Sequence, residues 1–209
     1  LREAVRNHKA DALLLHMPPL RWTSAAVELC PVFLSGGDWH GLPVTGVGYD
    51  AAVLVGTCVR RLQRLGHSRI AVPLDESGKR LTGAVRETLA AALSLTPSSP
   101  EIAALVPVSR DRTPGTWLRL WQTLFPRARP TAVIVSDDIH YFSLMSYCQM
   151  AGLHIPADVS VICLESTDPL EWCHPLPVRM RFPMKAALRV FRAWMRRGCR
   201  PAGMTFLQL

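Results

Sequence analysis

Short apolar runs alternate with longer amphipathic stretches along almost the whole chain. The runs at 132–135 and 159–164 are rich in β-branched residues, which is typical of strands buried in a parallel sheet. The stretch between them ends at Gly152, a residue that adopts the left-handed conformation of a helix C-cap without strain. Strands that alternate with helices predict an α/β fold in which helices flank parallel sheets.

The same pattern places the remaining elements. We expect further strands at 12–16, 31–34, 44–47, 70–72, 103–108, 178–182 and 204–209. We expect helices at 1–8, 22–29, 50–65, 81–93, 117–124 and 184–197, in addition to the helix that ends at Gly152. Residues 75–79 and 96–100 are rich in polar residues, serine or proline, and are expected to form a turn and a loop.

Two carboxylates follow the two apolar strands at 132–135 and 159–164. Asp137 follows the first strand after Ser136, and Glu165 comes directly after the second strand. The carboxyl ends of parallel strands share one sheet edge, and ligands of open α/β sheets bind outside that edge. The sequence therefore predicts a ligand site there. The neighbouring Asp138 is expected to be the N-cap of the following helix.

Composition fits a globular protein, because 49% of the 209 residues are hydrophobic and 19% are charged. No apolar run approaches the roughly 18 residues of a membrane span, so no membrane partner is expected. The chain begins at Leu1 and not at methionine. We therefore expect a piece of a longer protein, in which the lack of a signal peptide proves little.

The six cysteines are scattered and form no CxxC pair, so neither a metal cluster nor a redox motif is expected. They are interpreted as reduced thiols of a cytoplasmic protein. The formal charge of +8 raises the question of nucleic acid. Its arginines are dispersed over predicted amphipathic helices, where charge marks a solvated face. Direct contact with DNA is not expected, although a basic surface could assist a DNA-binding partner domain.

Several segments in the same order resemble one known family. They are ADAL at 10–13, LGHSRIA at 65–71, RLTG at 80–83, PTA at 130–132, the acidic pair at 137–138, GLHIPADVSVI at 152–162, and PLPVRM with FP at 175–183. Together they cover nearly the whole chain and resemble the effector-binding domain of LacI/GalR-type bacterial transcription regulators. Each segment alone is a weak signal.

This resemblance implies a periplasmic-binding-protein type I-like fold of two doubly wound parallel-sheet subdomains. Three crossovers join them, and the effector lies in the cleft between them. Residues 1–67 with 183–199 are expected to form the N-terminal subdomain, and 68–182 with 200–209 the C-terminal one. By this likeness the chain starts after the DNA-binding headpiece, the hinge and the first strand and helix, so the N-terminal subdomain would be truncated.

The resemblance also implies site residues. Arg80 matches an arginine that donates a bidentate pair to ligand oxygens, a task that suits a planar guanidinium. Asp137 matches a position where the family has Asn or Asp in contact with a sugar hydroxyl. Glu165 stands where the family usually has Asp, and its longer side chain would reach further into the cleft. Ordinary roles remain open for all three, as a surface arginine and loop carboxylates.

An arginine with two carboxylates suits a neutral, polyhydroxylated ligand such as a sugar. An anionic phosphate would favour a glycine-rich cradle, which the sequence lacks. A sugar also stacks on aromatic rings, so Trp117 is a candidate wall, with Trp39 and Trp172 as alternatives. Ser35, at the end of the strand at 31–34, is a further candidate contact. Each tryptophan could equally belong to the core or the surface.

The predicted function is that of a cytoplasmic effector-binding and dimerisation domain without cofactor or metal. Its partners would be a small effector, a second copy of the chain, and DNA through a headpiece absent from this sequence. The exposed apolar residues of the first helices are the expected dimer interface. No GxSxG elbow, phosphate-binding loop or HExxH pair indicates an enzyme.

Two alternatives stay open. The first is a periplasmic sugar-binding protein of the same fold, which the scattered cysteines disfavour. The second is a metal-dependent carbohydrate-active enzyme that uses the acidic pair at 137–138.

Overall fold

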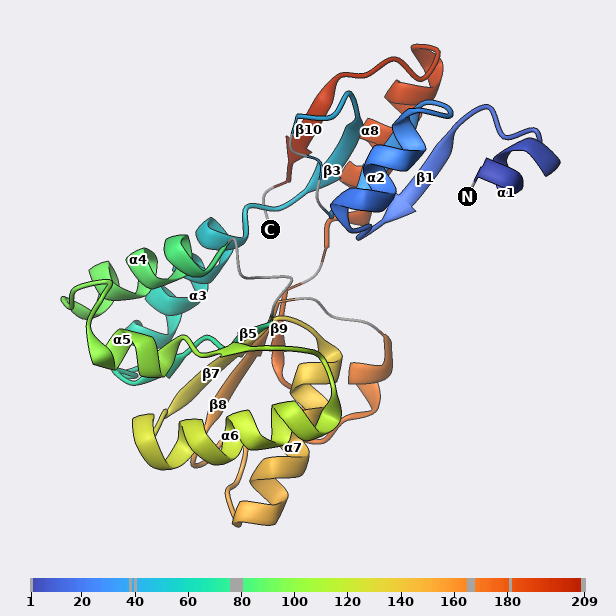
Figure 1. The fold of residues 1–209 in the computed structure, drawn as a ribbon. Helices are drawn as coiled ribbons and strands as arrows, with labels where there is room; N and C mark the ends of the chain where they lie inside the picture. Colours follow the sequence, from blue (N-terminus) through green and yellow to red (C-terminus); the bar gives the residue numbers. More distant parts are fainter. Residues whose placement is uncertain are drawn as a thin grey trace. The chain divides into compact units, whose positions relative to one another are not determined.

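The computed structural model describes residues 2–37, 39, 41–75, 81–164, 168–180 and 182–207 (Figure 1). The chain forms two compact units. Unit 1 consists of residues 1–50 and 183–209, and unit 2 consists of residues 51–182. Each contains a parallel sheet with helices packed against it, so the predicted α/β class is confirmed.

Unit 1 has a four-stranded parallel sheet in the order β1-β2-β3-β10. Its strands are β1 (Leu13–His16), β2 (Val32–Ser35), β3 (Thr45–Gly48) and β10 (Gly203–Phe206). Its helices are α1 (Arg2–Asn7), α2 (Leu20–Val27) and α8 (Met184–Arg196). Phe33 of β2 packs against Phe191 and Trp194 of α8, with ring centroids 5.0 and 5.4 Å apart. These aromatic contacts attach the strongly amphipathic α8 to the sheet.

Unit 2 has a second four-stranded parallel sheet in the order β4-β7-β8-β9, and a separate parallel pair of β5 and β6. Its strands are β4 (Ile70–Ala71), β5 (Leu74–Asp75), β6 (Val108–Ser109), β7 (Ala132–Val135), β8 (Ser160–Cys163) and β9 (Val178–Arg179). Its helices are α3 (Ala51–Arg64), α4 (Thr82–Leu93), α5 (Pro100–Leu105), α6 (Pro114–Ala128), α7 (Asp138–Ala151) and the 3-10 helix η2 (Asp168–Trp172). Strand β7 is buried along its whole length, as its apolar run predicts.

Helices α6 and α7 pack together through an aromatic cluster. Trp121 of α6 is fully buried, and its indole N–H donates to the hydroxyl of Ser143 on α7 at 3.0 Å. Its ring lies 5.4 Å from that of Trp117 and 6.5 Å from that of Phe125, which contacts Tyr147 at 4.9 Å. Because the buried indole N–H has a partner, this cluster combines large apolar burial with a satisfied polar group.

One predicted strand is wrong. Residues 103–108 were expected to be extended, but helix α5 occupies Pro100–Leu105 and only Val108–Ser109 forms a strand. The hydroxyl of Ser99 accepts the backbone N–H of Ile102 at 3.2 Å, and Pro100 occupies the first turn. This N-cap and a proline at the helix start favour a helix over the apolar run that follows.

The structure also divides the chain at other places than the sequence suggests. Helix α3, expected in the N-terminal subdomain, packs against α4 and β7 in unit 2. Strand β10, expected in the C-terminal subdomain, pairs in parallel with β3 of unit 1, with Gly203 opposite Thr45. The unit boundaries therefore lie at residues 50/51 and 182/183.

Along the described ranges, no helix combines the length and apolar character of a membrane span.

Candidate functional site

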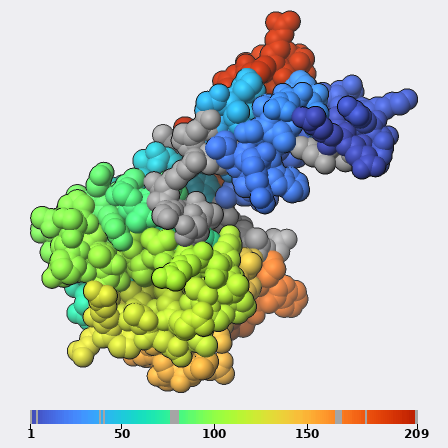
Figure 2. Space-filling model, in the orientation of Figure 1, coloured from blue at the N-terminus to red at the C-terminus, as the bar shows by residue number. Residues whose placement is uncertain are grey.

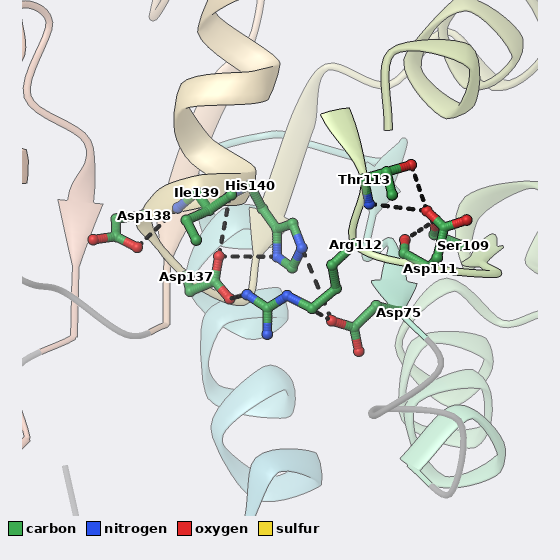
Figure 3. A network of polar contacts seen from close by, with 9 residues as sticks. All are labelled: Asp75, Ser109, Asp111, Arg112, Thr113, Asp137, Asp138, Ile139 and His140. Carbon is green, nitrogen blue, oxygen red and sulfur yellow. Dashed lines mark hydrogen bonds and ion pairs between the residues drawn. The ribbon is translucent and has the colours of Figure 1, made fainter. Parts of the chain in front are cut away.

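Four polar side chains from three separate segments meet at the carboxyl edge of the strands of unit 2. Asp75 ends β5, Arg112 follows β6, and Asp137 and His140 follow β7. Figure 3 shows these side chains pointing toward one another, with Arg112 between the two carboxylates. We call this group the edge cluster. It lies at the kind of sheet edge where the sequence predicts a ligand site.

Asp137 is fixed by the start of α7. It is the N-cap, and its Oδ1 accepts the backbone N–H of His140 at 3.1 Å. The prediction that Asp138 caps this helix is therefore wrong: Asp138 is the first helical residue, and its Oδ1 accepts the N–H of Ile139 at 2.8 Å. Asp137 has the extended backbone that an N-cap requires, which lets its side chain fold back over the first turn.

Arg112 bridges the two carboxylates. Its Nη2 donates to Oδ2 of Asp137, and its Nε lies 3.4 Å from Oδ2 of Asp75. The side chain of Arg112 is 48% exposed, whereas those of Asp137 and Asp75 are 16% and 7% exposed. The guanidinium thus donates to the two carboxylates through Nε and Nη2, while part of the side chain remains exposed to solvent.

The loop that carries Arg112 is held by its own hydrogen bonds. Asp111 Oδ1 accepts the backbone N–H of Thr113 at 2.9 Å and the Thr113 hydroxyl at 2.7 Å. The hydroxyl of Ser109 donates to the carbonyl of Asp111 at 2.7 Å. The hydrogen bonds from the Thr113 hydroxyl and backbone N–H lower the pKa of Asp111. Such local side-chain-to-backbone bonds define the loop conformation and so the base from which Arg112 extends.

His140 lies beneath Arg112 with a side chain only 1% exposed. Its Nδ1 is 3.1 Å from Asp137 Oδ1 and its Nε2 is 4.0 Å from Asp75 Oδ2, yet neither ring nitrogen makes an aligned hydrogen bond. Burial lowers the pKa of His140, and Arg112 lowers it further, while Asp137 and Asp75 act in the opposite direction. The imidazole is therefore neutral at neutral pH.

Trp117 supports this histidine. Its ring stacks on the imidazole of His140 with centroids 3.8 Å apart, and the residue is 2% exposed. Its indole N–H is buried without a hydrogen-bond partner. Trp117 and His140 also border a groove of about 440 Å³ between α6 and α7, together with Arg112. The sequence predicts Trp117 as a wall for a sugar; in the structure its ring face lies against His140.

Of the other predicted site residues, the structure describes Ser35. Ser35 ends β2 in unit 1, where its hydroxyl is 3.3 Å from Nδ1 of His16, its partner in the strand register. Arg80 and Glu165 lie outside the described residues. The structure thus brings Asp137 and Trp117 together through His140. The ligand-binding roles of all five residues, Ser35, Arg80, Trp117, Asp137 and Glu165, stay predictions.

The sequence does not predict three members of the edge cluster, Asp75, Arg112 and His140, as site residues. Asp75 was assigned to a polar turn, although it directly follows Leu74 in a two-residue strand. Arg112 lies in a run of charged residues that carries no motif, and His140 is one residue of an amphipathic helix. The spacing of Asp137 and His140, an N-cap and its third following residue, could have indicated their contact.

Other surface features of unit 2 are open grooves. Helices α5 and α6, coloured green to yellow-green in Figure 2, border one of about 680 Å³ that is lined in part by Arg110, Arg119 and Arg127.

All six cysteines are free thiols, and three of them are buried. Among the described residues, no group of three His, Cys, Asp or Glu side chains is placed to hold a metal ion.

The comparisons with known proteins identify the family. Residues 59–197 match the model of the periplasmic binding protein-like domain, so the chain belongs to this family. No curated protein is similar enough in sequence to match.

Solved structures share the fold over nearly the whole chain. The transcription regulator CcpA of Lactococcus lactis has a TM-score of 0.78 at 16% identity, covering 99% of this chain and 78% of its own. A LacI family transcriptional regulator from Mycobacterium smegmatis has a TM-score of 0.76 at 23% identity, with 97% and 76% covered. A CcpA from Weissella paramesenteroides with bound sucrose has a TM-score of 0.72 at 14% identity, with 99% and 77% covered.

Proposed function

We propose that this chain is the effector-binding domain of a LacI/GalR-like transcription regulator and that its effector is a neutral sugar or a related polyol. The edge cluster carries this proposal. It gathers a guanidinium and two carboxylates at the carboxyl edge of the strands, in a domain of the periplasmic binding protein-like family. The sucrose complex of the Weissella regulator, which has the same fold, supports the ligand class.

The charges of the edge cluster favour a neutral ligand. Arg112 contributes one positive charge, Asp75 and Asp137 contribute two negative charges, and His140 is neutral. An anionic ligand would meet this excess of negative charge in a partly desolvated environment, which costs free energy. Hydroxyl groups can donate to carboxylates and accept from a guanidinium, so a polyol matches both kinds of partner without adding charge.

The remaining parts of the proposal come from the resemblance. Arg80 and Glu165 would complete the contacts of unit 2, and Ser35 would be a further contact with the effector. Binding would shift the domain between two conformational states, and a DNA-binding headpiece outside this sequence would read that change.

The domain would act as a cytoplasmic homodimer, because two headpieces read a palindromic operator. Trp22 of α2 is 53% exposed, which supports the expected interface on the first helices. We propose no catalytic activity. Asp137, the acidic residue that a metal-dependent enzyme would require, instead caps α7 and pairs with Arg112.

A thermal-shift panel tests the proposed function. Neutral mono- and disaccharides, polyols, sugar phosphates and amino acids are each added to the purified chain at millimolar concentration. We expect at least one neutral sugar to raise the melting temperature, since a ligand that binds only the folded state stabilises it by mass action. A panel in which only the anionic compounds stabilise the protein would contradict the ligand class.

Variants then test the location. Arg80→Ala is expected to abolish the shift, whereas Arg110→Ala, an exposed arginine of the α5–α6 groove, should keep it. An undiminished shift in Arg80→Ala would refute the placement of the site.

Two rival functions have tests of their own. A signal peptide encoded upstream in place of a helix-turn-helix would favour a periplasmic binding protein, and stabilisation by divalent metal ions would favour an enzyme.

A further inference from the structure

We propose that Arg112 is the direct effector contact of the edge cluster, and that Asp137 and Asp75 are positioning residues that act through it. This inference rests on the proposed function and deepens it. The resemblance places Asp137 itself against a sugar hydroxyl, so the two accounts assign the contact to different side chains.

Asp137 is already engaged within the protein. Its Oδ1 accepts the backbone N–H of His140 and also faces the imidazole Nδ1, and its Oδ2 accepts from Arg112. Its side chain is 16% exposed. A hydroxyl that bound Asp137 directly would have to compete with a charge-assisted hydrogen bond, which is about twice as strong as a neutral one.

Arg112 has the opposite character. Its Nε and Nη2 face the two carboxylates, and its side chain is 48% exposed. A guanidinium has five N–H donors. Some of them therefore remain available to ligand oxygens when Arg112 pairs with Asp75 and Asp137. The two ion pairs hold the planar group in one orientation. Less side-chain entropy is then lost when a ligand binds, which is how preorganisation raises affinity.

Two buried side chains, His140 and Trp117, lie next to the carboxylates that hold the guanidinium of Arg112. The two nitrogens of His140 face one carboxylate each, Nδ1 toward Asp137 and Nε2 toward Asp75, and the ring of Trp117 stacks on the imidazole. Neither ring nitrogen of His140 makes an aligned hydrogen bond, and Nδ1 faces Oδ1 of Asp137, so Oδ2 of Asp137 is left to accept from Arg112. The carboxylates therefore remain acceptors for the guanidinium, and Arg112 presents its remaining donors to neutral ligand oxygens.

A double-mutant cycle separates the two accounts. The affinity for the most stabilising sugar of the thermal-shift panel is measured by calorimetry for the wild type, Arg112→Gln, Asp137→Asn and the double variant. Asparagine is as good an N-cap as aspartate, so Asp137→Asn keeps the helix start and removes only the charge that holds Arg112. Arg110→Gln, two residues before Arg112 and exposed, is the matched control.

We expect Arg112→Gln to weaken binding by about 10- to 100-fold, the loss of hydrogen bonds from a charged donor. Asp137→Asn should weaken binding by about 3- to 10-fold, since Asp75 still holds the guanidinium. The double variant should bind no more weakly than Arg112→Gln alone, because Asp137 has nothing left to position. Arg110→Gln should bind like the wild type.

The possible outcomes are distinct. Losses that multiply in the double variant would show that Asp137 contacts the sugar itself and would overturn the inference. Wild-type affinity in Arg112→Gln would overturn it as well, while sugar binding, and with it the proposed function, would stand. If the wild type binds no sugar at all, the proposed function fails and the inference with it. Melting curves without ligand confirm that each variant is folded.

Discussion

Replacing Trp117 tests whether the layer beneath the edge cluster is structural. Trp117 is 2% exposed, and a buried tryptophan removes about 150–250 Å² from water. Trp117→Ala would lose this burial and leave a cavity under His140, and substitutions of this kind cost about 3–5 kcal/mol. Trp117→Phe keeps a ring to stack on the imidazole. It also removes the buried indole N–H that has no partner, which offsets about 1–3 kcal/mol of the lost packing.

The free energy of unfolding should therefore fall by about 3–5 kcal/mol in Trp117→Ala and by less than about 2 kcal/mol in Trp117→Phe. Urea denaturation followed by far-ultraviolet circular dichroism measures both changes. Trp172 is 87% exposed, so Trp172→Ala is the matched control and should change stability by less than about 0.5 kcal/mol. Equal stabilities of Trp117→Ala and the control, together with lost sugar binding, would show that Trp117 is a ligand wall and refute its structural role.

Three further predictions concern the same unit. Asp137→Ala should lower the free energy of unfolding by about 1 kcal/mol more than Asp137→Asn, because only asparagine still caps α7; equal denaturation midpoints would contradict the cap. Burial lowers the pKa of His140 from 6.5, so the unfolded chain takes up the proton first and stability declines as the pH falls below that value. Midpoints measured from pH 8 to 5 should decline less in His140→Phe, and an unchanged slope would be inconsistent with a buried neutral imidazole. Burial also raises the pKa of Cys58 and Cys148 to about 11, so a thiol reagent at pH 8 should label the partly exposed Cys199 first, and equal rates in the folded protein would count against this.

The fold could be predicted from the sequence wherever the pattern was long and strong. The buried strand β7 and the helix that ends at Gly152 have unambiguous local signals, and Gly152 adopts the expected left-handed C-cap with φ of 68°. Residues 103–108 were assigned wrongly because a short apolar run fits a strand and a helix equally well. There the Ser99 cap decided the outcome.

The site was harder to predict for a physical reason. Asp137 could be found because it follows a strong strand, but Arg112 and Asp75 come from segments 25 and more residues away that carry no motif. Their meeting depends on the tertiary packing of β5, β6 and α7, which periodicity does not encode. The same packing determines that Asp137 pairs with Arg112 in addition to capping α7. The local sequence indicates only the cap.

Hydrogen–deuterium exchange with and without the most stabilising sugar tests the central claim most directly, because it locates the bound ligand without a substitution. The account predicts slower exchange in the segments at 73–75, 109–113 and 136–141, which carry the edge cluster, and unchanged exchange on the outer face of α6 near 119–127. A sugar that raises the melting temperature but protects none of the three segments would contradict it.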